Sequence, residues 1–166
     1  MGNSVSPISF ESASQTTATP SVNLGTRRTV GLVDYIYVYN AAAASIAQGQ
    51  CGYLATTSMS SGYSVTVTNL VAQVGGHLVV GVAHNASIPA AEYGWLATRG
   101  PAVVVALDSG EVSLTSGDHL AAGIDGGFAK GTVTLSTGIR MGVAIGSCVT
   151  VTTITNKAAF RSPLFG

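Results

Sequence analysis

The sequence predicts an all-β protein, an antiparallel sandwich or barrel of jelly-roll-like or tulip-like form with an extended N-terminal arm. Three observations predict this fold. Apolar and polar residues alternate with a period of two from Val30 onward, 21 glycines recur along the chain, and β-branched residues dominate the apolar stretches. Only residues 40–48 have a composition that favours a helix, and we interpret them as a loop or at most one turn. This pattern excludes a parallel β/α fold.

Residues 1–26 form a separate section, rich in Ser, Thr, Asn and Pro, in which Glu11 is the only charged residue. The apolar residues of this section have no regular spacing; they are Val5, Ile8, Phe10, Val22 and Leu24. We therefore expect an extended arm that either docks on another surface or stays mobile. A single β domain is expected over residues 27–156, and residues 157–166 are expected to form a C-terminal tail.

The strands follow from the alternation, because successive side chains of a strand point to opposite faces. Tyr35, Tyr37 and Tyr39 share one face, whereas Ile36 and Val38 lie on the other. Further short strands are expected at residues 63–68, 78–83, 102–107, 112–114, 132–135, 142–145 and 149–155. Turn signals separate the later ones, at Asp108-Ser109-Gly110, Ser116-Gly117-Asp118 and Asp125-Gly126-Gly127.

Residues 45–56 align without gaps with residues 87–98, at an offset of 42 residues. Ser, Ile, Gly, Leu, Ala and Thr are identical at matching positions, and Tyr53 matches Trp95. The shared unit is a turn that leads into an aromatic strand, and we expect Tyr53, Trp95 and Leu96 to lie in the core. Our hypothesis is that the two segments belong to two structurally equivalent halves of the chain. The alternative is convergent turn chemistry, and unrelated backbone paths in the two segments would contradict the hypothesis.

Charge is scarce in this chain. Seven Lys and Arg balance seven Asp and Glu, so that 8% of residues are charged, against about 25% in an ordinary domain. Such a chain has no long-range field to attract nucleic acid or anionic lipid. Gly, Ser, Thr and Gln interrupt every apolar stretch before it reaches the length of a membrane helix, and no secretory signal is visible. We expect neither a nucleic-acid partner nor a membrane partner.

Catalytic and metal-binding motifs are absent from the sequence, including H-E-x-x-H, G-x-S-x-G, the P-loop and G-x-G-x-x-G. His77, His84 and His119 lack the close spacing of metal ligands and are expected at the surface or at strand ends. We expect no enzyme, no cofactor and no metal. Cys51 and Cys148 lie in apolar strand-like stretches and are expected to be reduced thiols.

The few charges are unevenly placed. From Asp34 to Asp125 the sequence has six acidic residues but only one basic residue, Arg99. No acidic residue follows Asp125. The basic residues of the final third are Lys130, Arg140, Lys157 and Arg161. Either this is an ordinary surface distribution, or the last third forms a basic patch that meets an acidic partner.

The stretch Glu92-Tyr93-Gly94-Trp95-Leu96-Ala97-Thr98-Arg99-Gly100-Pro101-Ala102 resembles the aromatic strand and Gly-Pro turn of small structural proteins of tailed bacteriophages. The resemblance covers residues 85–155. It includes Gly117-Asp118-His119-Leu120, Met141-Gly142-Val143-Ala144-Ile145 and a closing Val/Thr strand at residues 149–155. It points to the capsid decoration, or cement, proteins of double-stranded DNA phages.

That resemblance implies a protein of the capsid exterior, made in the host cytoplasm, which binds the major capsid protein and clamps its adjacent subunits, often as a homotrimer. The residues expected to contact partners are Val5, Ile8, Phe10, Arg27, Arg28, Phe160, Arg161 and Phe165. The alternative is a carbohydrate-binding β-sandwich module, displayed on a virion or cell surface, in which Trp95 and Tyr53 stack against sugars.

Overall fold

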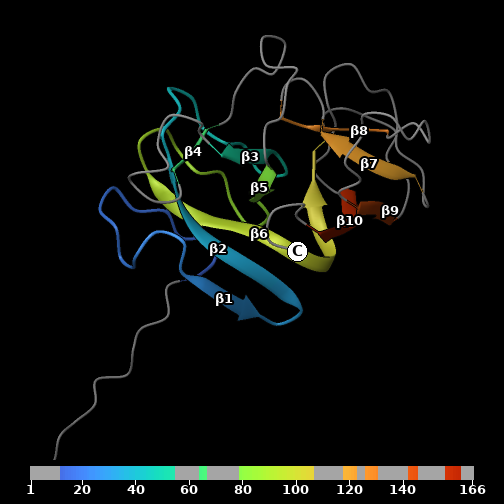
Figure 1. Ribbon diagram of the computed structural model, residues 1–166, viewed down its shortest axis with the longest axis horizontal. Coiled ribbons are helices and arrows are strands. Elements are labelled where there is room, and N and C mark those ends of the chain that lie inside the picture. Colours follow the sequence, from blue (N-terminus) through green and yellow to red (C-terminus); the bar gives the residue numbers. More distant parts are fainter. Residues whose placement is uncertain are drawn as a thin grey trace, which may run out of the picture.

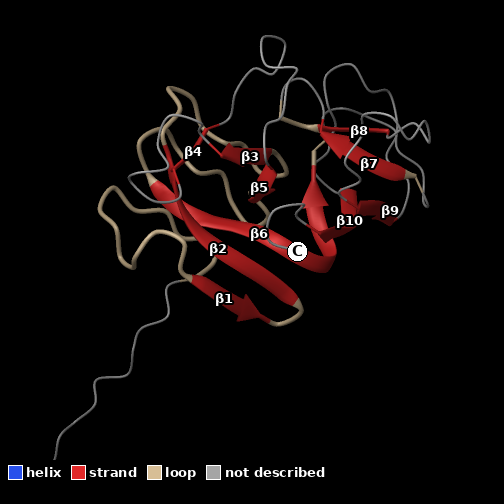
Figure 2. Cartoon of the chain, viewed as in Figure 1, coloured by secondary structure: helices blue, strands red, loops and turns tan. Residues whose placement is uncertain are grey.

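The computed structural model of the protein describes residues 12–54, 64–66, 79–106, 118–122, 126–130, 142–145 and 156–161. These residues contain ten strands and no helix, which confirms the all-β prediction (Figure 2). The strands are β1 (Arg27–Val30), β2 (Val33–Asn40), β3 (Cys51–Leu54), β4 (Ser64–Thr66), β5 (Val79–Val82), β6 (Tyr93–Val105), β7 (His119–Ala122), β8 (Phe128–Lys130), β9 (Gly142–Ile145) and β10 (Asn156–Arg161).

The strands join in one sheet in the order β1-β2-β4-β3-β5-β6-β10-β9-β7-β8 (Figure 1). Every pairing is antiparallel except that of β2 with β4, which is parallel. Strand β2 also pairs with β6, so that the pairings of β2, β4, β3, β5 and β6 form a closed circuit. Strands β10, β9, β7 and β8 extend the sheet from β6.

Strand β6 connects the two parts of the sheet. Its first half pairs with β2 as far as Arg99, and its second half pairs with β10 from Arg99 to Val105. The ribbon bends between the halves (Figure 1). The turn expected at Gly100-Pro101 is therefore wrong, because both residues lie inside one strand. Proline lacks the N–H that a ladder needs, and the register of β10 shifts opposite this position, between Ala158 and Phe160.

Some of the other expected strands are confirmed, and others lie outside the described residues. Residues 63–68 and 78–83 contain β4 and β5, and residues 142–145 are β9. The strands expected at 112–114, 132–135 and 149–155 lie outside the described residues. Residues 157–161, expected to be part of a tail, instead form most of β10, which pairs with β6 on one side and β9 on the other. Tail composition gave no hint of this partner, because strand pairing is a tertiary contact.

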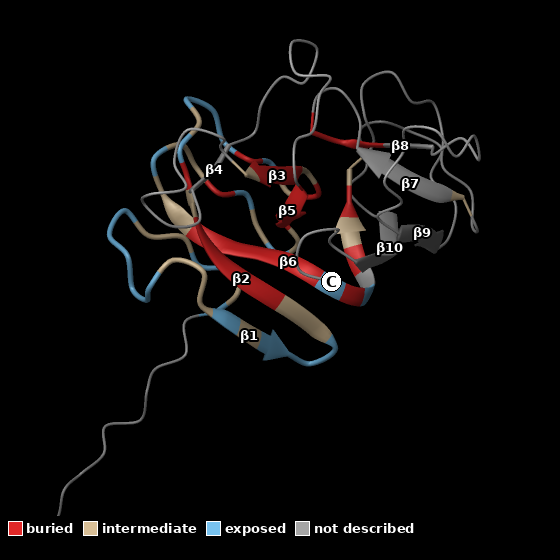
Figure 3. Cartoon of the chain, viewed as in Figure 1, coloured by how far each residue is buried: buried red, intermediate tan, exposed pale blue. Residues whose placement is uncertain are grey.

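The core has two clusters that follow the alternation of β2. Tyr35 and Tyr37 belong to one cluster, together with Trp95, whereas Ile36 and Val38 belong to the other. Figure 3 shows the buried residues concentrated along β2, β3, β5 and the first half of β6. The sequence-predicted core residues Tyr53, Trp95 and Leu96 are all buried, with exposed fractions of 1%, 4% and 0%.

In the described residues, the two aligned segments make matching hydrogen bonds at their turns, as that hypothesis predicts. Gly49 donates its N–H to the Ala83 carbonyl, and the Ala83 N–H donates to Gln50. At the matching positions, Ala91 donates to Asn40, and the Asn40 N–H donates to Glu92. The turn bonds also match, from Gln50 to Ala47 and from Glu92 to Pro89.

Each aligned segment is preceded by a strand, β2 in the first case and β5 in the second, and these two strands pair with the opposite segment. β3, which ends the first segment, pairs with β5, whereas the corresponding part of β6 pairs with β2. Gly52 lies opposite Gly81 in one ladder, and Gly94 lies opposite Val38 in the other. The strand of each aligned segment therefore pairs with the strand that precedes the other segment. These crossed pairings join the two segments in one folded unit.

Residues 12–26 of the expected arm are fixed to the sheet. Thr17 and Tyr93 exchange both backbone hydrogen bonds, and Gly25 and Thr26 bond to the backbone of Tyr37. The Tyr37 hydroxyl accepts from the Ser21 N–H at 3.2 Å and lies 3.2 Å from the Thr17 hydroxyl. This half of the arm docks on the protein's own β2 and β6.

Candidate interaction surface

The hairpin of β1 and β2 carries two exposed apolar side chains. Val30 pairs with Val33 across a two-residue loop, Gly31-Leu32, and Gly31 has φ of 61°. A glycine with positive φ at the first loop position is typical of the tight hairpin turns that match strand twist. Val30 is 49% exposed and Leu32 79% exposed. We call Val30, Gly31 and Leu32 the hairpin tip.

Strand β1 is the end strand of the described sheet, because it pairs only with β2. Such an end strand directs backbone N–H and C=O groups away from its single neighbour. The sequence did not single out the hairpin tip, although its signal is present: a Gly between two apolar runs marks a hairpin turn.

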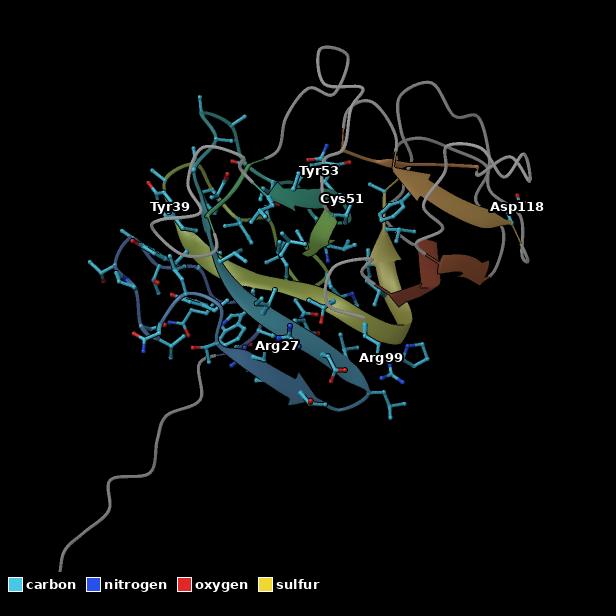
Figure 4. The ribbon with its side chains drawn as sticks, viewed as in Figure 1. Arg27, Tyr39, Cys51, Tyr53, Arg99 and Asp118 are labelled. Atoms are coloured by element: carbon cyan, nitrogen blue, oxygen red, sulfur yellow. The ribbon has the colours of Figure 1, made fainter. Side chains whose placement is uncertain are left out.

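A charged row crosses the sheet beside the hairpin tip. In strand register Thr29 lies opposite Asp34, Asp34 opposite Arg99, and Arg99 opposite Arg161. The Thr29 hydroxyl donates to Asp34 Oδ1 at 2.7 Å. Arg27 lies two residues before Thr29 and is exposed, as is Arg99. Figure 4 labels Arg27 and Arg99, which come from β1 and β6, two of the strands that pair with β2.

Arg28 has a different role. Its guanidinium lies 3.9 Å from the ring centroid of Trp95, the distance of a cation–π contact. It therefore covers a core aromatic of its own chain, although the sequence placed it among the partner contacts. A pocket of about 290 Å³ lies nearby, lined by Arg27, Arg28, Thr29, Asp34, Tyr35 and Thr98.

Tyr35 and His84 are held by hydrogen bonds close to that pocket. Asn85 Nδ2 donates to the Tyr35 hydroxyl at 3.0 Å. Burial raises the pKa of the Tyr35 phenol, and Asn85 and the charge of Arg28 partly offset this rise. His84 Nδ1 accepts the Val104 N–H at 2.8 Å, so this nitrogen carries no proton. His84 follows β5 closely, as expected for a strand-end histidine, His119 begins β7, and His77 lies outside the described residues.

The aromatic residues that the carbohydrate alternative requires are not accessible. Trp95 and Tyr53 are almost fully buried, so neither ring presents a face to a sugar. A second depression, of about 400 Å³, is lined by Pro20, Ser21, Val22, Asn23, Leu24 and Tyr93. Tyr93 there packs against Tyr39 at 4.9 Å between centroids and stacks on Tyr37 at 6.0 Å.

Cys51 is a buried free thiol in β3, in agreement with the prediction of a reduced cysteine. Burial raises the pKa of this thiol well above its usual range, and a hydrogen bond with Tyr53 partly offsets the rise. Cys148 lies outside the described residues.

Two further properties concern the described part of the chain alone. Within it, no three His, Cys, Asp or Glu side chains come together in a way that would hold a metal ion. It also contains no helix with the length and hydrophobicity of a membrane span.

The expected partner contacts separate into three groups. Val5, Ile8, Phe10 and Phe165 lie outside the described residues. Phe160 and Arg161 occupy β10, where they pair in register with Gly100 and Arg99. Arg27 and Arg28 lie on β1. Strands β2 and β6 separate Arg27 on β1 from Arg161 on β10. Arg161 lies opposite Arg99, which the sequence did not select.

The comparisons with known proteins identify no relative: no family model matches the chain, and no curated protein sequence matches it.

Proposed function

We propose that this protein is a non-enzymatic structural protein that binds the outer surface of a phage head and clamps adjacent major capsid subunits. The resemblance of residues 92–102 and the later glycine motifs to decoration proteins supports the proposal. So does the low charge, because the buried centre of an interface is depleted in Lys, Glu and Asp.

The observation that carries the proposal is the hairpin tip. Leu32, at 79% exposed, is the most exposed of the three large exposed apolar side chains among the described residues, and Val30 is beside it at the end strand of the sheet. Full burial of a leucine or valine side chain contributes about 1.5–3 kcal/mol. The hairpin tip is therefore a contact that gains free energy only when a partner covers it.

A homotrimer would present three such tips. Each tip alone provides a weak contact, but a linked set binds with an affinity above that of one tip, because later contacts form at high effective concentration. We infer that this multivalency, on a lattice of repeated capsid subunits, is the mechanism of stabilisation.

The direct experiment mixes the purified protein with phage heads that lack a decoration protein and images them by cryo-electron microscopy. Density at threefold or quasi-threefold positions is expected, together with a trimer mass in sedimentation equilibrium. Leu32→Ser should reduce the occupancy of heads without changing the midpoint of urea unfolding. Heads without added density would contradict the proposal. Equal occupancy for wild type and Leu32→Ser would contradict the role of the hairpin tip.

A matched control is Val22→Ser, because Val22 is also exposed but lies in the docked arm rather than at the hairpin tip. Its occupancy should equal that of the wild type. If both variants lose occupancy equally, general surface hydrophobicity rather than the hairpin tip would explain binding.

A further inference from the structure

Strand β1 offers backbone hydrogen-bonding groups on its outer edge, the edge away from β2. Just before β1 begins, the Tyr37 N–H donates to the Thr26 carbonyl at 2.9 Å. Along an antiparallel ladder, pairs that exchange hydrogen bonds alternate with pairs that do not. In this register Arg28 and Val30 bond to β2. Thr29, which lies between them, therefore directs its backbone N–H and C=O outward.

Residues 29–32 leave this outer edge open. All four are exposed, and within the part of the chain that the structure describes no strand except β2 pairs with β1 (Figure 1). The Thr29 hydroxyl donates to Asp34 on β2, but among the same described residues no further segment accepts from or donates to the Thr29 backbone. These outward groups are therefore available to an added strand, as at the edge of any sheet.

The open edge also has an apolar side. Val30 lies opposite Val33, so its side chain is on the face of the sheet that carries Val33 and Tyr35. Val33 packs against the core cluster that contains Tyr35, whereas Val30 is 49% exposed. Side chains on neighbouring strands interact when they share a face. An apolar side chain on an added strand would therefore cover Val30 and extend that cluster outward.

We propose that the outer edge of β1 is the docking site for an extended segment of the major capsid subunit. This segment adds to the sheet as a further strand, bonds to the outward N–H and C=O of Thr29, and places an apolar side chain against Val30. In strand addition, main-chain hydrogen bonds provide affinity and alternate side chains provide specificity. This inference rests on the proposed function and specifies it: the hairpin tip meets the capsid through backbone pairing.

A capsid segment fits this edge better than a second copy of the chain does. Strand β1 has four residues and is therefore about 13 Å long. Two paired strands of this length cover far less than the roughly 1,200–2,000 Å² of a stable interface. An oligomer on a capsid makes several strand contacts at once, so that each contact can be small. A second copy on this edge would also cover the hairpin tip that the proposed capsid contact requires.

The test removes the outward N–H of Thr29 while keeping the ladder of β1 and β2. Thr29→Pro does this, because proline lacks an N–H and is tolerated on edge strands where that group faces away from the neighbour. Binding to phage heads that lack a decoration protein is measured by cosedimentation. We expect Thr29→Pro to bind at least about fivefold more weakly, since each contact loses a backbone hydrogen bond and the ring occupies the place of the added strand.

Asp34→Ala is the matched control. Thr29→Pro also removes the hydroxyl bond between Thr29 and Asp34, and Asp34→Ala removes the same bond from the β2 side while keeping the outward N–H. Its binding to heads should equal that of the wild type. Circular dichroism and the urea midpoint check that each variant folds.

Hydrogen exchange of the wild type supplies a measurement that depends on no variant. The Thr29 amide should exchange at least about tenfold more slowly on heads than in the free protein, because the added strand accepts its hydrogen bond. The Val30 amide, which bonds to β2, is the internal reference. Protection of Thr29 that grows with protein concentration in the absence of heads would show a second copy on this edge and would overturn the inference.

These measurements separate this inference from the proposed function. Wild-type binding without protection of the Thr29 amide, or equal binding by a folded Thr29→Pro, would overturn strand addition and leave the capsid proposal in place. If Thr29→Pro does not fold, the exchange of the wild-type amide decides. Heads that bind no wild-type protein would overturn both.

Discussion

Ile46 and Ile88 exchange both backbone hydrogen bonds, N–H to carbonyl in each direction, at 2.9 Å. These two residues occupy the same position in the two aligned segments, 42 residues apart. Two equivalent residues that form an antiparallel pair lie on either side of a local twofold axis. The two halves therefore meet around this pair, and both isoleucine side chains are buried in one cluster.

The equivalence extends to an uncommon backbone conformation. Gly49 and Ala91 occupy matching positions, and both are left-handed, with φ of 86° and 58°. This conformation costs alanine roughly 1 kcal/mol, whereas glycine adopts it freely. We expect Ala91→Gly to raise the free energy of unfolding by up to about 1 kcal/mol, measured by urea denaturation.

The matched substitution, Gly49→Ala, should have the opposite sign. A Cβ at Gly49 would lie 2.5 Å from the Ala106 nitrogen and 2.8 Å from the Val105 carbonyl carbon, both backbone atoms that must shift. We expect a loss of roughly 2 kcal/mol or more from strain and overpacking. Unchanged stability of Gly49→Ala would contradict the close backbone contacts at this position.

The contact between Arg28 and Trp95 can be tested with an intrinsic probe, because the chain has one tryptophan. Arg28→Ala should lower the free energy of unfolding by about 0.5–2 kcal/mol, since it removes a cation–π contact and the cover of a core ring. The emission of Trp95 should shift to longer wavelength as water reaches it. Arg27→Ala serves as the control, and an identical emission shift in that variant would count against the contact.

The Tyr37 hydroxyl anchors residues 17–21 to the sheet through Thr17 and Ser21. Tyr37→Phe keeps the ring but removes these bonds, so the free energy of unfolding should fall by about 1 kcal/mol. Cleavage by a protease within residues 12–26 should become faster. Tyr39→Phe, on the same strand, should leave the cleavage rate unchanged. Equal acceleration in both variants would contradict a specific role of the Tyr37 hydroxyl in holding the arm.

The buried thiol of Cys51 makes stability depend on alkaline pH. Its pKa is raised in the folded state by burial, so the unfolded chain releases the proton first, near its ordinary value of 9.0. The stabilising effect is complete below that pH and declines as the pH rises above it. Tyr35 acts in the same direction from about 10.0.

We therefore expect the urea midpoint of a Cys148→Ser variant to fall as the pH rises above about 9. Cys51→Ala in that background should remove part of the decline. At neutral pH a thiol reagent should react with Cys51 only after unfolding, because the thiolate is the reactive form and the sulfur is buried. Rapid reaction in the native protein would show that Cys51 is accessible.

Local residue patterns determined several elements directly. The alternation of β2 predicted the two faces that Tyr37 and Ile36 occupy, since side-chain direction in a strand depends only on position along the chain. The gapless alignment predicted two segments with matching turns, because identical turn residues favour identical backbone paths. The burial of Trp95 and Leu96 followed from the same composition.

What the tertiary structure alone decided is which strands become neighbours. Nothing local distinguishes residues 157–161 as a strand, because β10 is stabilised by its ladders with β6 and β9. The pairings of β6 with β10 and β2 place Arg99 opposite Arg161 on one side and opposite Asp34 on the other. The sequence by itself therefore determined an all-β chain with an internal duplication and little charge. The tertiary structure placed Arg99 between Asp34 and the end of β10, because cross-strand contacts depend on long-range register that no local residue pattern encodes.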